Sequence, residues 1–270
     1  MAGKIYVVGF GPGSEEHLTP AARRAIEACD VCVGYRTYVE LVQPLLKGKT
    51  VVSTGMTEEV DRGRKAYDLA KAGKVVSLIS SGDPGVYGMS GLMLEVLKEA
   101  GWDPEHPDVE LEVVPGITAL NSIAALLGAP LNHDFCAISL STLLTPWEAI
   151  ERRLQAAAWA DFVVALYNPK SGRRDWQIAK AQEILLKARP ASTPVGVVKS
   201  GYREGQRVVL CTLDAMADQE IGMLTTVIIG NSASQRFGNY IVTPRGYSGK
   251  YDLATKGGDL SAPWLQEKQA

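Results

Sequence analysis

The stretch Ile5-Tyr6-Val7-Val8-Gly9-Phe10-Gly11-Pro12-Gly13-Ser14 decides the fold class of this chain. An apolar, β-branched run comes first, and glycines follow at alternate positions. The run is typical of a strand buried in a parallel sheet. The glycines predict a loop at the carboxyl end of that strand, where the backbone turns sharply and approaches a ligand closely. We therefore expect an open α/β sheet with a binding crevice at this edge.

This loop departs from the dinucleotide-binding fingerprint. The pattern G-x-G-x-x-G requires glycine at position 14, where the chain has Ser14, and Pro12 removes a backbone N–H donor on which a phosphate cradle depends. The acidic residue expected at the end of the second strand is replaced by Gly34-Tyr35. The loop therefore favours a ligand without a pyrophosphate, such as S-adenosylmethionine, over the cofactor of a nucleotide-dependent oxidoreductase.

The composition describes an ordinary globular protein. The chain has 270 residues, of which 46% are hydrophobic, enough for one large or two modest domains. A net charge of −2 argues against a general nucleic-acid binder, which usually has a basic excess. No apolar run is long enough to span a bilayer, and the first residues enter a strand rather than a signal peptide. We expect a cytoplasmic protein with no nucleic-acid or membrane partner.

The cysteines and histidines do not predict a metal site. Cys29 and Cys32 form a C-x-x-C motif, which can be a redox pair or half of a metal site. The stronger interpretation is that Cys29 closes a helix and Cys32 is a small core residue of the next strand. The three histidines lie at no metal-ligand spacing. We expect no metal bound to the protein itself.

Strand and helix patterns alternate along the chain. We predict strands at 5–8, 30–34, 51–53, 74–80, 111–114, 135–140, 162–166, 194–198, 207–211 and 225–229. We predict helices at 19–29, 57–72, 89–100, 118–127, 146–157 and 173–188. This order predicts two α/β domains: a parallel sheet with helices on both faces over residues 1–116, and a mixed sheet over residues 117–247. Residues 248–270 form a polar tail.

Four motifs in order make the chain resemble a known family. They are Gly9-Phe10-Gly11-Pro12-Gly13, Gly82-Asp83-Pro84, Val114-Pro115-Gly116-Ile117-Thr118-Ala119 and Thr225-Thr226-Val227-Ile228-Ile229-Gly230. Together they resemble the tetrapyrrole methylases, the class III S-adenosylmethionine-dependent methyltransferases, over residues 4–245. Within that family the chain is most similar to the precorrin-3B C17-methyltransferase group, by the segments 33–38, 80–89, 166–171 and 242–247.

The resemblance implies an activity and an architecture. The activity is methylation of C17 of precorrin-3B or cobalt-factor III, with ring contraction to precorrin-4 or its cobalt form, in cobalamin biosynthesis. The architecture is a homodimer of two-domain subunits, with the active site in the cleft between the domains. Some members carry a further C-terminal region with an iron–sulfur cluster. We expect no such cluster here, because no cysteine follows Cys211.

The resemblance also carries site residues over by position. Those expected to contact S-adenosylmethionine are Gly11, Pro12, Gly82, Asp83, Val86, Thr118, Ala119, Tyr167, Gly201 and Thr225. Asp83 has an equally plausible second interpretation, as a turn aspartate that bonds to its own backbone.

The implied substrate is a large macrocycle with many carboxylates, so cations are expected around it. The candidates are Arg36, Lys170, Arg173 and Arg174, because arginine pairs with carboxylates through two parallel hydrogen bonds. The last three follow a buried strand and open a predicted helix, where cations are unfavourable unless an anion binds. Lys199, Arg203 and Arg245 are further candidates. The competing interpretation is that these residues only solvate the surface.

Methyl transfer asks mainly for alignment and exclusion of water. Ring contraction also requires a proton to leave an oxygen of the macrocycle, and Ser81, Asp83 or Tyr87 could assist. No residue is assigned as the catalytic base. The open alternatives are methylation of another tetrapyrrole position, of ribosomal RNA or of a protein, and a non-catalytic ligand carrier of the same fold.

Overall fold

The computed structural model describes residues 3–172, 175–251 and 253. The chain divides into two compact units. One comprises Met1–Leu126 with Val198–Arg207, and the other comprises Leu127–Val197 with Val208–Ala270. The first unit thus extends past the boundary predicted between residues 116 and 117. It also includes a segment that the sequence placed in the second domain.

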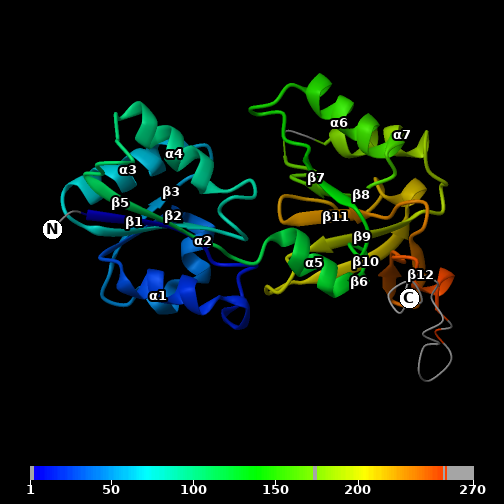
Figure 1. Cartoon of the computed structure of the whole chain (residues 1–270), viewed down its shortest axis with the longest axis horizontal. Helices are drawn as coiled ribbons and strands as arrows, with labels where there is room; N and C mark the ends of the chain where they lie inside the picture. Colours follow the sequence, from blue (N-terminus) through cyan, green and yellow to red (C-terminus); the bar gives the residue numbers. More distant parts are fainter. Residues whose placement is uncertain (1–2, 173–174, 252, 254–270) are drawn as a thin grey trace, which may run out of the picture. The chain divides into compact units, whose positions relative to one another are not determined.

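The first unit is built on a five-stranded sheet in the order β3-β2-β4-β1-β5 (Figure 1). All four strand pairs are parallel, as predicted. The strand bounds are β1 Gly3–Gly9, β2 Val31–Tyr35, β3 Thr50–Thr54, β4 Val75–Ser80 and β5 Val109–Val114. Every strand therefore ends at the same edge, and the glycine loops that follow β1 and β4 are neighbours there.

Helices cover both faces of this sheet. Ile5 and Val7 of β1 point into a core shared with α3 (Glu59–Lys71) and α4 (Met89–Glu99), whereas Val8 points into a core on the side of α1 (Pro20–Ala28). Figure 1 shows α1 on one side of the sheet and α3 and α4 on the other. Alternate side chains of a strand point to opposite faces, so a continuous apolar run fills both cores.

Local signals explain most helix ends. The Thr19 side chain accepts a hydrogen bond from the Ala22 N–H at 3.1 Å, and Pro20 occupies the first turn of α1, as predicted. Gly73 follows α3 with φ +83°. The sequence did not predict α2 (Arg36–Leu41), which starts directly after β2. Its N-cap residue is Tyr35, whose side chain makes no capping hydrogen bond.

The second unit has a mixed five-stranded sheet in the order β10-β9-β11-β8-β7. β7 and β8 are parallel, and β11 runs antiparallel to β8, so the sheet is mixed, as predicted. The bounds are β7 Phe135–Ser139, β8 Val163–Tyr167, β9 Pro194–Lys199, β10 Arg207–Thr212 and β11 Thr225–Ile229. Its main core also contains apolar residues of α6 (Trp147–Trp159) and α7 (Gln177–Leu186).

Two features of this unit differ from the prediction. The predicted helix start at residue 173 is wrong, since α7 begins at Gln177 with Trp176 as its N-cap. A small third sheet, in the order β12-β13-β6, was not predicted. Its strands are β6 Gly128–Ala129, β12 Gln235–Phe237 and β13 Tyr240–Val242. Strands of two or three residues are too short to show an alternating pattern. α5 (Ala119–Leu127) lies where the chain first passes from the first unit to the second.

Three loops approach one another closely at the carboxyl edge of the first sheet. A Cβ atom added at Gly9 would lie 2.6 Å from the carbonyl oxygen of Gly82 and 2.9 Å from the Gly116 nitrogen. A Cβ atom at Gly116 would collide with the carbonyl oxygens of both Gly82 and Gly9. Only glycine fits at these positions, because backbone occupies the space that a side chain would need.

We predict that Gly116→Ala lowers the free energy of unfolding by about 1–3 kcal/mol, because the new methyl group displaces backbone rather than a flexible side chain. Urea unfolding monitored by circular dichroism measures it. Gly91→Ala is the matched control, since Gly91 lies exposed in α4 with no atom within 4 Å of the added methyl. It should raise the free energy of unfolding by about 0.5–1 kcal/mol. Equal effects of the two substitutions would contradict the close-packed edge.

Candidate cofactor and substrate site

The first two glycine loops are joined by paired backbone hydrogen bonds. The Gly11 N–H donates to the Gly82 carbonyl at 3.1 Å, and the Gly82 N–H donates to the Gly11 carbonyl at 2.8 Å. Both residues have a left-handed backbone, with φ of +76° and +69°. This conformation favours glycine. Two residues predicted to contact the cofactor therefore lie side by side.

Asp83 connects the second glycine loop to the third. Its Oδ1 accepts from the Gly85 N–H at 2.8 Å, and its Oδ2 accepts from the Gly116 N–H at 3.0 Å. The first bond is the turn contact proposed as the alternative role of Asp83. The second ties the loops after β4 and β5 together. Both carboxylate oxygens are thus used within the loops.

The segment Val198–Arg207 packs on the first glycine loop. The Tyr202 ring lies 4.0 Å from the His17 ring, centroid to centroid, and His17 Nδ1 is 2.7 Å from the Ser14 hydroxyl. Ser200 and Tyr202 have φ values of +50° and +59°. Left-handed backbone costs energy in residues other than glycine, so the packing of this segment holds two residues in a strained conformation.

Arg203 reaches from this segment to both glycine loops. Its Nε donates to the Pro12 carbonyl, and its Nη2 donates to the Ser81 hydroxyl at 2.6 Å. Burial lowers the pKa of Arg203, because the charged guanidinium loses solvation. Burial also raises the pKa of the nearby Tyr38 phenol, while the charge of Arg203 acts in the opposite direction.

Neither Tyr38 nor Arg62 was predicted to belong to the site. Arg62 is 4% exposed, and it donates through Nε to the Thr54 hydroxyl at 2.7 Å and through Nη2 to the Gly55 carbonyl at 2.9 Å. Burial lowers its pKa. The sequence contained a sign of this role for Arg62. Residue 62 lies on the same buried face of the helix as Ala66 and Ala70, where an arginine is unusual.

The remaining predicted residues of this unit flank the loops. Val86 and Tyr87 are exposed in the loop before α4, and Tyr87 has φ +55°. Thr118 and Ala119 lie where the third loop enters α5, and Gly201 lies in the segment Val198–Arg207.

The predicted residues of the second unit gather at one edge of its sheet. Tyr167 ends β8 and is 9% exposed. β11 is antiparallel to β8 with Val227 opposite Leu166, so Thr225, the first residue of β11, lies at the same edge. Its hydroxyl accepts from the Gly222 N–H at 3.0 Å. Asn168 follows Tyr167 with φ +50° and donates to the Ser139 hydroxyl at 3.0 Å.

The predicted substrate cations are only partly described. Arg36 is the first residue of α2 and is exposed, and Lys170 is half-buried. Arg173 and Arg174 lie outside the described residues. Since α7 begins at Gln177, the argument that these cations face the first turn of a helix is not supported.

The C-x-x-C thiols are buried core groups. Burial raises the pKa of Cys32 to about 12, and it also raises the pKa of Cys29. The Cys29 thiol donates to the Ile26 carbonyl. Within the described ranges, no three histidine, cysteine or acidic side chains are grouped to hold a metal ion. None of the helices described is long and apolar enough to cross a membrane.

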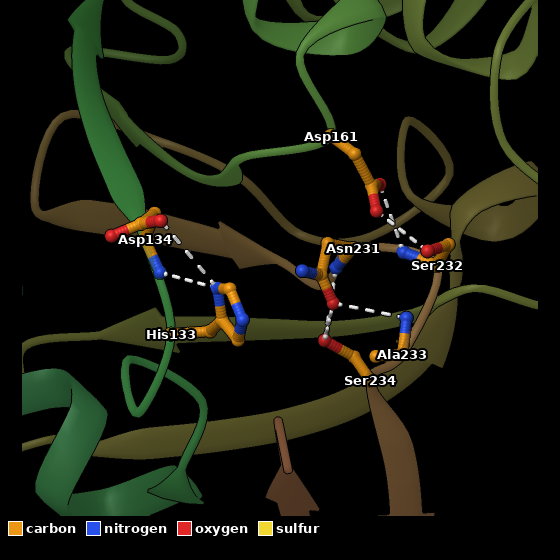
Figure 2. Close-up of polar contacts among 7 residues, drawn as sticks. All are labelled: His133, Asp134, Asp161, Asn231, Ser232, Ala233 and Ser234. Atoms are coloured by element: carbon orange, nitrogen blue, oxygen red, sulfur yellow. Dashed lines mark hydrogen bonds and ion pairs between the residues drawn. The ribbon is translucent and has the colours of Figure 1, made fainter. Parts of the chain in front are cut away.

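A second polar cluster lies in the second unit, beyond the amino ends of β7 and β8 (Figure 2). Asp161 accepts from the Ser232 N–H at 3.0 Å and from its hydroxyl at 2.5 Å, and the Asn231 side chain accepts from Ala233 and Ser234. These groups border a cavity of about 340 Å³. Their bonds hold the turn after β11, and Arg245, one of the further candidates for a substrate cation, lines the same cavity.

Comparison with known proteins decides the family. The profile of the Tetrapyrrole (Corrin/Porphyrin) Methylases matches residues 4–217. The chain belongs to this family. The resemblance seen in the four motifs is therefore confirmed, and so is the cofactor, because tetrapyrrole methylases use S-adenosylmethionine.

Several relatives are similar over most of the chain. It is 60% identical over 253 residues to a cobalt-factor III methyltransferase of Priestia megaterium, covering 94% of this chain but 47% of the relative. It is 46% identical to a probable cobalt-factor III C(17)-methyltransferase of Salmonella typhimurium, covering 90% of this chain and 99% of the relative. It is 41% identical to a precorrin-3B C(17)-methyltransferase of Sinorhizobium, covering 92% and 99%.

Solved structures agree with the fold. The crystal structure of the methyltransferase CobJ matches with a TM-score of 0.83 and 38% identity, covering 90% of this chain and all of that one. A uroporphyrin-III C-methyl transferase of Thermus thermophilus, solved with S-adenosylhomocysteine, matches with a TM-score of 0.65 and 28% identity, covering 84% and 92%. The predicted fold class of two α/β domains, one parallel and one mixed, is confirmed.

We predict that Asp83→Ala lowers the free energy of unfolding by about 1–3 kcal/mol and weakens S-adenosylhomocysteine binding, because two loops lose a shared acceptor. Asp83→Asn should have a smaller effect, since one carbonyl acceptor remains. Urea unfolding and titration calorimetry measure the two quantities.

Asp103→Ala is the matched control for this prediction. Asp103 accepts from the Glu105 N–H at 2.9 Å, the same turn contact that Asp83 makes with Gly85, and its other oxygen bonds only within its own turn, to His106. Ligand affinity should be unchanged in this variant. An Asp83→Ala protein that binds S-adenosylhomocysteine as tightly as the unchanged protein would show that the loop connection does not shape the site.

Proposed function

We propose that this protein transfers a methyl group from S-adenosylmethionine to C17 of cobalt-factor III, or of its metal-free counterpart precorrin-3B, in cobalamin biosynthesis. The supporting observation is the 60% identity to the cobalt-factor III methyltransferase of Priestia megaterium over 94% of this chain. The chain spans about half of that relative, but nearly all of the Salmonella and Sinorhizobium relatives. Identity is higher to the Priestia and Salmonella cobalt-factor III relatives, at 60% and 46%, than to the Sinorhizobium precorrin-3B relative, at 41%, which favours the cobalt-containing substrate.

The first-unit edge has features that suit the cofactor. Pro12 and the backbone pairing of Gly11 with Gly82 leave few free N–H donors there, which suits a ligand without phosphates. The proposed contacts in this unit are Gly11, Pro12, Gly82, Asp83, Val86, Thr118, Ala119 and Gly201. Tyr167 and Thr225 of the second unit complete the proposed set, and an active site shared by the two units stays a prediction.

When bound, S-adenosylmethionine supplies an electrophilic methyl group on a sulfonium. The chain's own part is to bind, to align and to exclude water, which can account for a large share of the rate. The loops after β1, β4 and β5 are suited to aligning the cofactor, because hydrogen bonds tie each loop to the next. Arg36, Lys170, Arg173 and Arg174 are proposed to pair with carboxylates of the macrocycle.

The three candidates for moving a proton differ in their surroundings. Both Asp83 oxygens accept backbone bonds, and the Ser81 hydroxyl accepts from the Arg203 cation, so neither group is well suited to remove a proton. Tyr87 is exposed, and it stays a candidate. No residue is assigned as the base.

A homodimer and a cytoplasmic location are also part of this proposal. The homodimer is implied by the resemblance to the family, and the cytoplasmic location is the expectation from the sequence. Size-exclusion chromatography with light scattering measures the mass in solution and so tests the dimer.

Anaerobic incubation with methyl-labelled S-adenosylmethionine and cobalt-factor III tests the reaction. We expect mass spectrometry to find one labelled methyl group on the macrocycle, and carbon NMR to place it at C17. Precorrin-3B in a parallel incubation distinguishes the two substrate forms. Binding of S-adenosylmethionine without methyl gain by either macrocycle would overturn the substrate assignment and leave the family membership intact.

We further predict that replacing both Arg173 and Arg174 with alanine weakens binding of cobalt-factor III by about tenfold or more. The reason is that the carboxylates of the macrocycle lose two guanidinium groups as partners. Affinity for S-adenosylhomocysteine should not change. Arg152→Ala with Arg153→Ala is the matched control, since this adjacent pair lies exposed on α6. Unchanged tetrapyrrole affinity in a fluorescence or absorbance titration would contradict the assignment.

A further inference from the structure

Arg203 is a half-buried cation whose neighbours leave its charge unbalanced. Among the described residues no carboxylate forms an ion pair with it, and the neighbouring Tyr38 phenol is uncharged near neutral pH because burial raises its pKa further. Its hydrogen-bond acceptors, the Pro12 carbonyl and the Ser81 hydroxyl, are neutral. Removing a cation from water without a counter-charge is costly, so an anion at this point would be stabilising.

The guanidinium has donors left for such an anion. Its Nε and Nη2 point to the two glycine loops, which fixes the plane of the group. A guanidinium carries five N–H donors, so the other edge, formed by Nη1 and the second hydrogen of Nη2, is available for two parallel bonds. This pattern matches a carboxylate, and the bonds to the loops hold the fork in position in advance.

The surroundings strengthen the positive field. The Ser81 and Tyr38 hydroxyls lie beside Arg203, and the buried Arg62 acts on the same tyrosine. The Tyr35 ring is near both Arg62 and Tyr38. The Arg62 guanidinium carbon lies 6.0 Å from the centroid of this ring, and the centroid of the Tyr38 ring lies 5.2 Å from it. Arg62 thus adds positive charge near Tyr38, while its own donors bond to Thr54, Gly55 and Met89.

We propose that Arg203, supported by Ser81 and Tyr38, is a binding site for a ligand carboxylate. The proposal rests on the proposed function, which supplies carboxylates from two sources. One is the methionyl part of the cofactor, and the other is the set of side chains on the macrocycle. Arg203 then has two tasks, since one edge of its guanidinium holds the loops together and the other binds the ligand.

Binding measurements on Arg203→Gln separate the two sources. Three probes are titrated: S-adenosylhomocysteine, its decarboxylated analogue, which keeps the amine and lacks only the carboxylate, and cobalt-factor III. Loss of the charged bonds should weaken binding of the recognised ligand roughly 10- to 100-fold. Arg203→Lys should recover part of the affinity, because lysine keeps the charge but not the fork. Arg24→Gln, at an exposed arginine of α1 in the same unit, is the control.

Each outcome decides the proposal. Weaker binding of S-adenosylhomocysteine with unchanged binding of the decarboxylated analogue supports a site for the cofactor carboxylate. Unchanged binding of both with weaker binding of cobalt-factor III supports a site for a macrocycle carboxylate. Equal weakening of S-adenosylhomocysteine and its analogue overturns the proposal, because Arg203 then only braces the loops. Unchanged binding of all three probes overturns it as well.

These readouts do not depend on turnover. If the unchanged protein methylates neither macrocycle, the proposed function fails in the incubation experiment, while the comparison of S-adenosylhomocysteine with its decarboxylated analogue still reports on Arg203. The unfolding midpoint of each variant, measured alongside, shows whether the protein remains folded during the titration.

Discussion

The close approach of three backbone loops is the constraint on which the first unit depends. Gly9 and Gly116 lie so near Gly82 that a methyl group added to either would collide with the Gly82 carbonyl oxygen. Parallel strands all end at one edge, so the β1, β4 and β5 loops are brought together by topology. Glycine then lets the backbone itself form the surface, and Asp83 fixes the spacing by accepting from two of the loops.

A surface made of backbone leaves charge to be supplied from elsewhere. The segment Val198–Arg207 is distant in sequence, yet it contributes Arg203 to the first two loops. Left-handed residues at 200 and 202 and the stacking of Tyr202 on His17 accompany this placement. Strain in a loop persists only where surrounding contacts over-determine it, and such positions are concentrated at functional sites.

The sequence predicted the parts of the fold that have a local pattern. The apolar run at 5–8, the proline and threonine before α1, and the glycine after α3 each have a physical cause within a few residues. The same reasoning failed for α7, whose start was placed at 173, and for α2, which has no capping side chain. Strands as short as β6 have no period to detect, because pairing with β13 alone defines them.

The residues of the candidate site also differ in whether a local sequence pattern could predict them. Gly11, Gly82 and Asp83 could be chosen from sequence, because turn chemistry and strand ends are local. The contact between Arg203 and Pro12 spans 191 residues, so no window of sequence contains it. Arg62 could have been noticed as a charge on a buried helical face, but its partners lie on other elements. Long-range contacts of this kind depend on the completed fold.

The bonding of Asp83 and Ser81 also explains why a search for a catalytic constellation in the sequence finds none. A carboxylate that accepts from two backbone amides, and a hydroxyl that accepts from a desolvated guanidinium, are both stabilised as acceptors in fixed positions. Groups held in this way are weaker proton acceptors, because the hydrogen bonds stabilise them as they are, but they hold the loops together. For a reaction whose electrophile comes with the cofactor, rigid alignment is the larger contribution that a protein can make. The residue types that suit proton transfer are therefore used here to hold the loops in place.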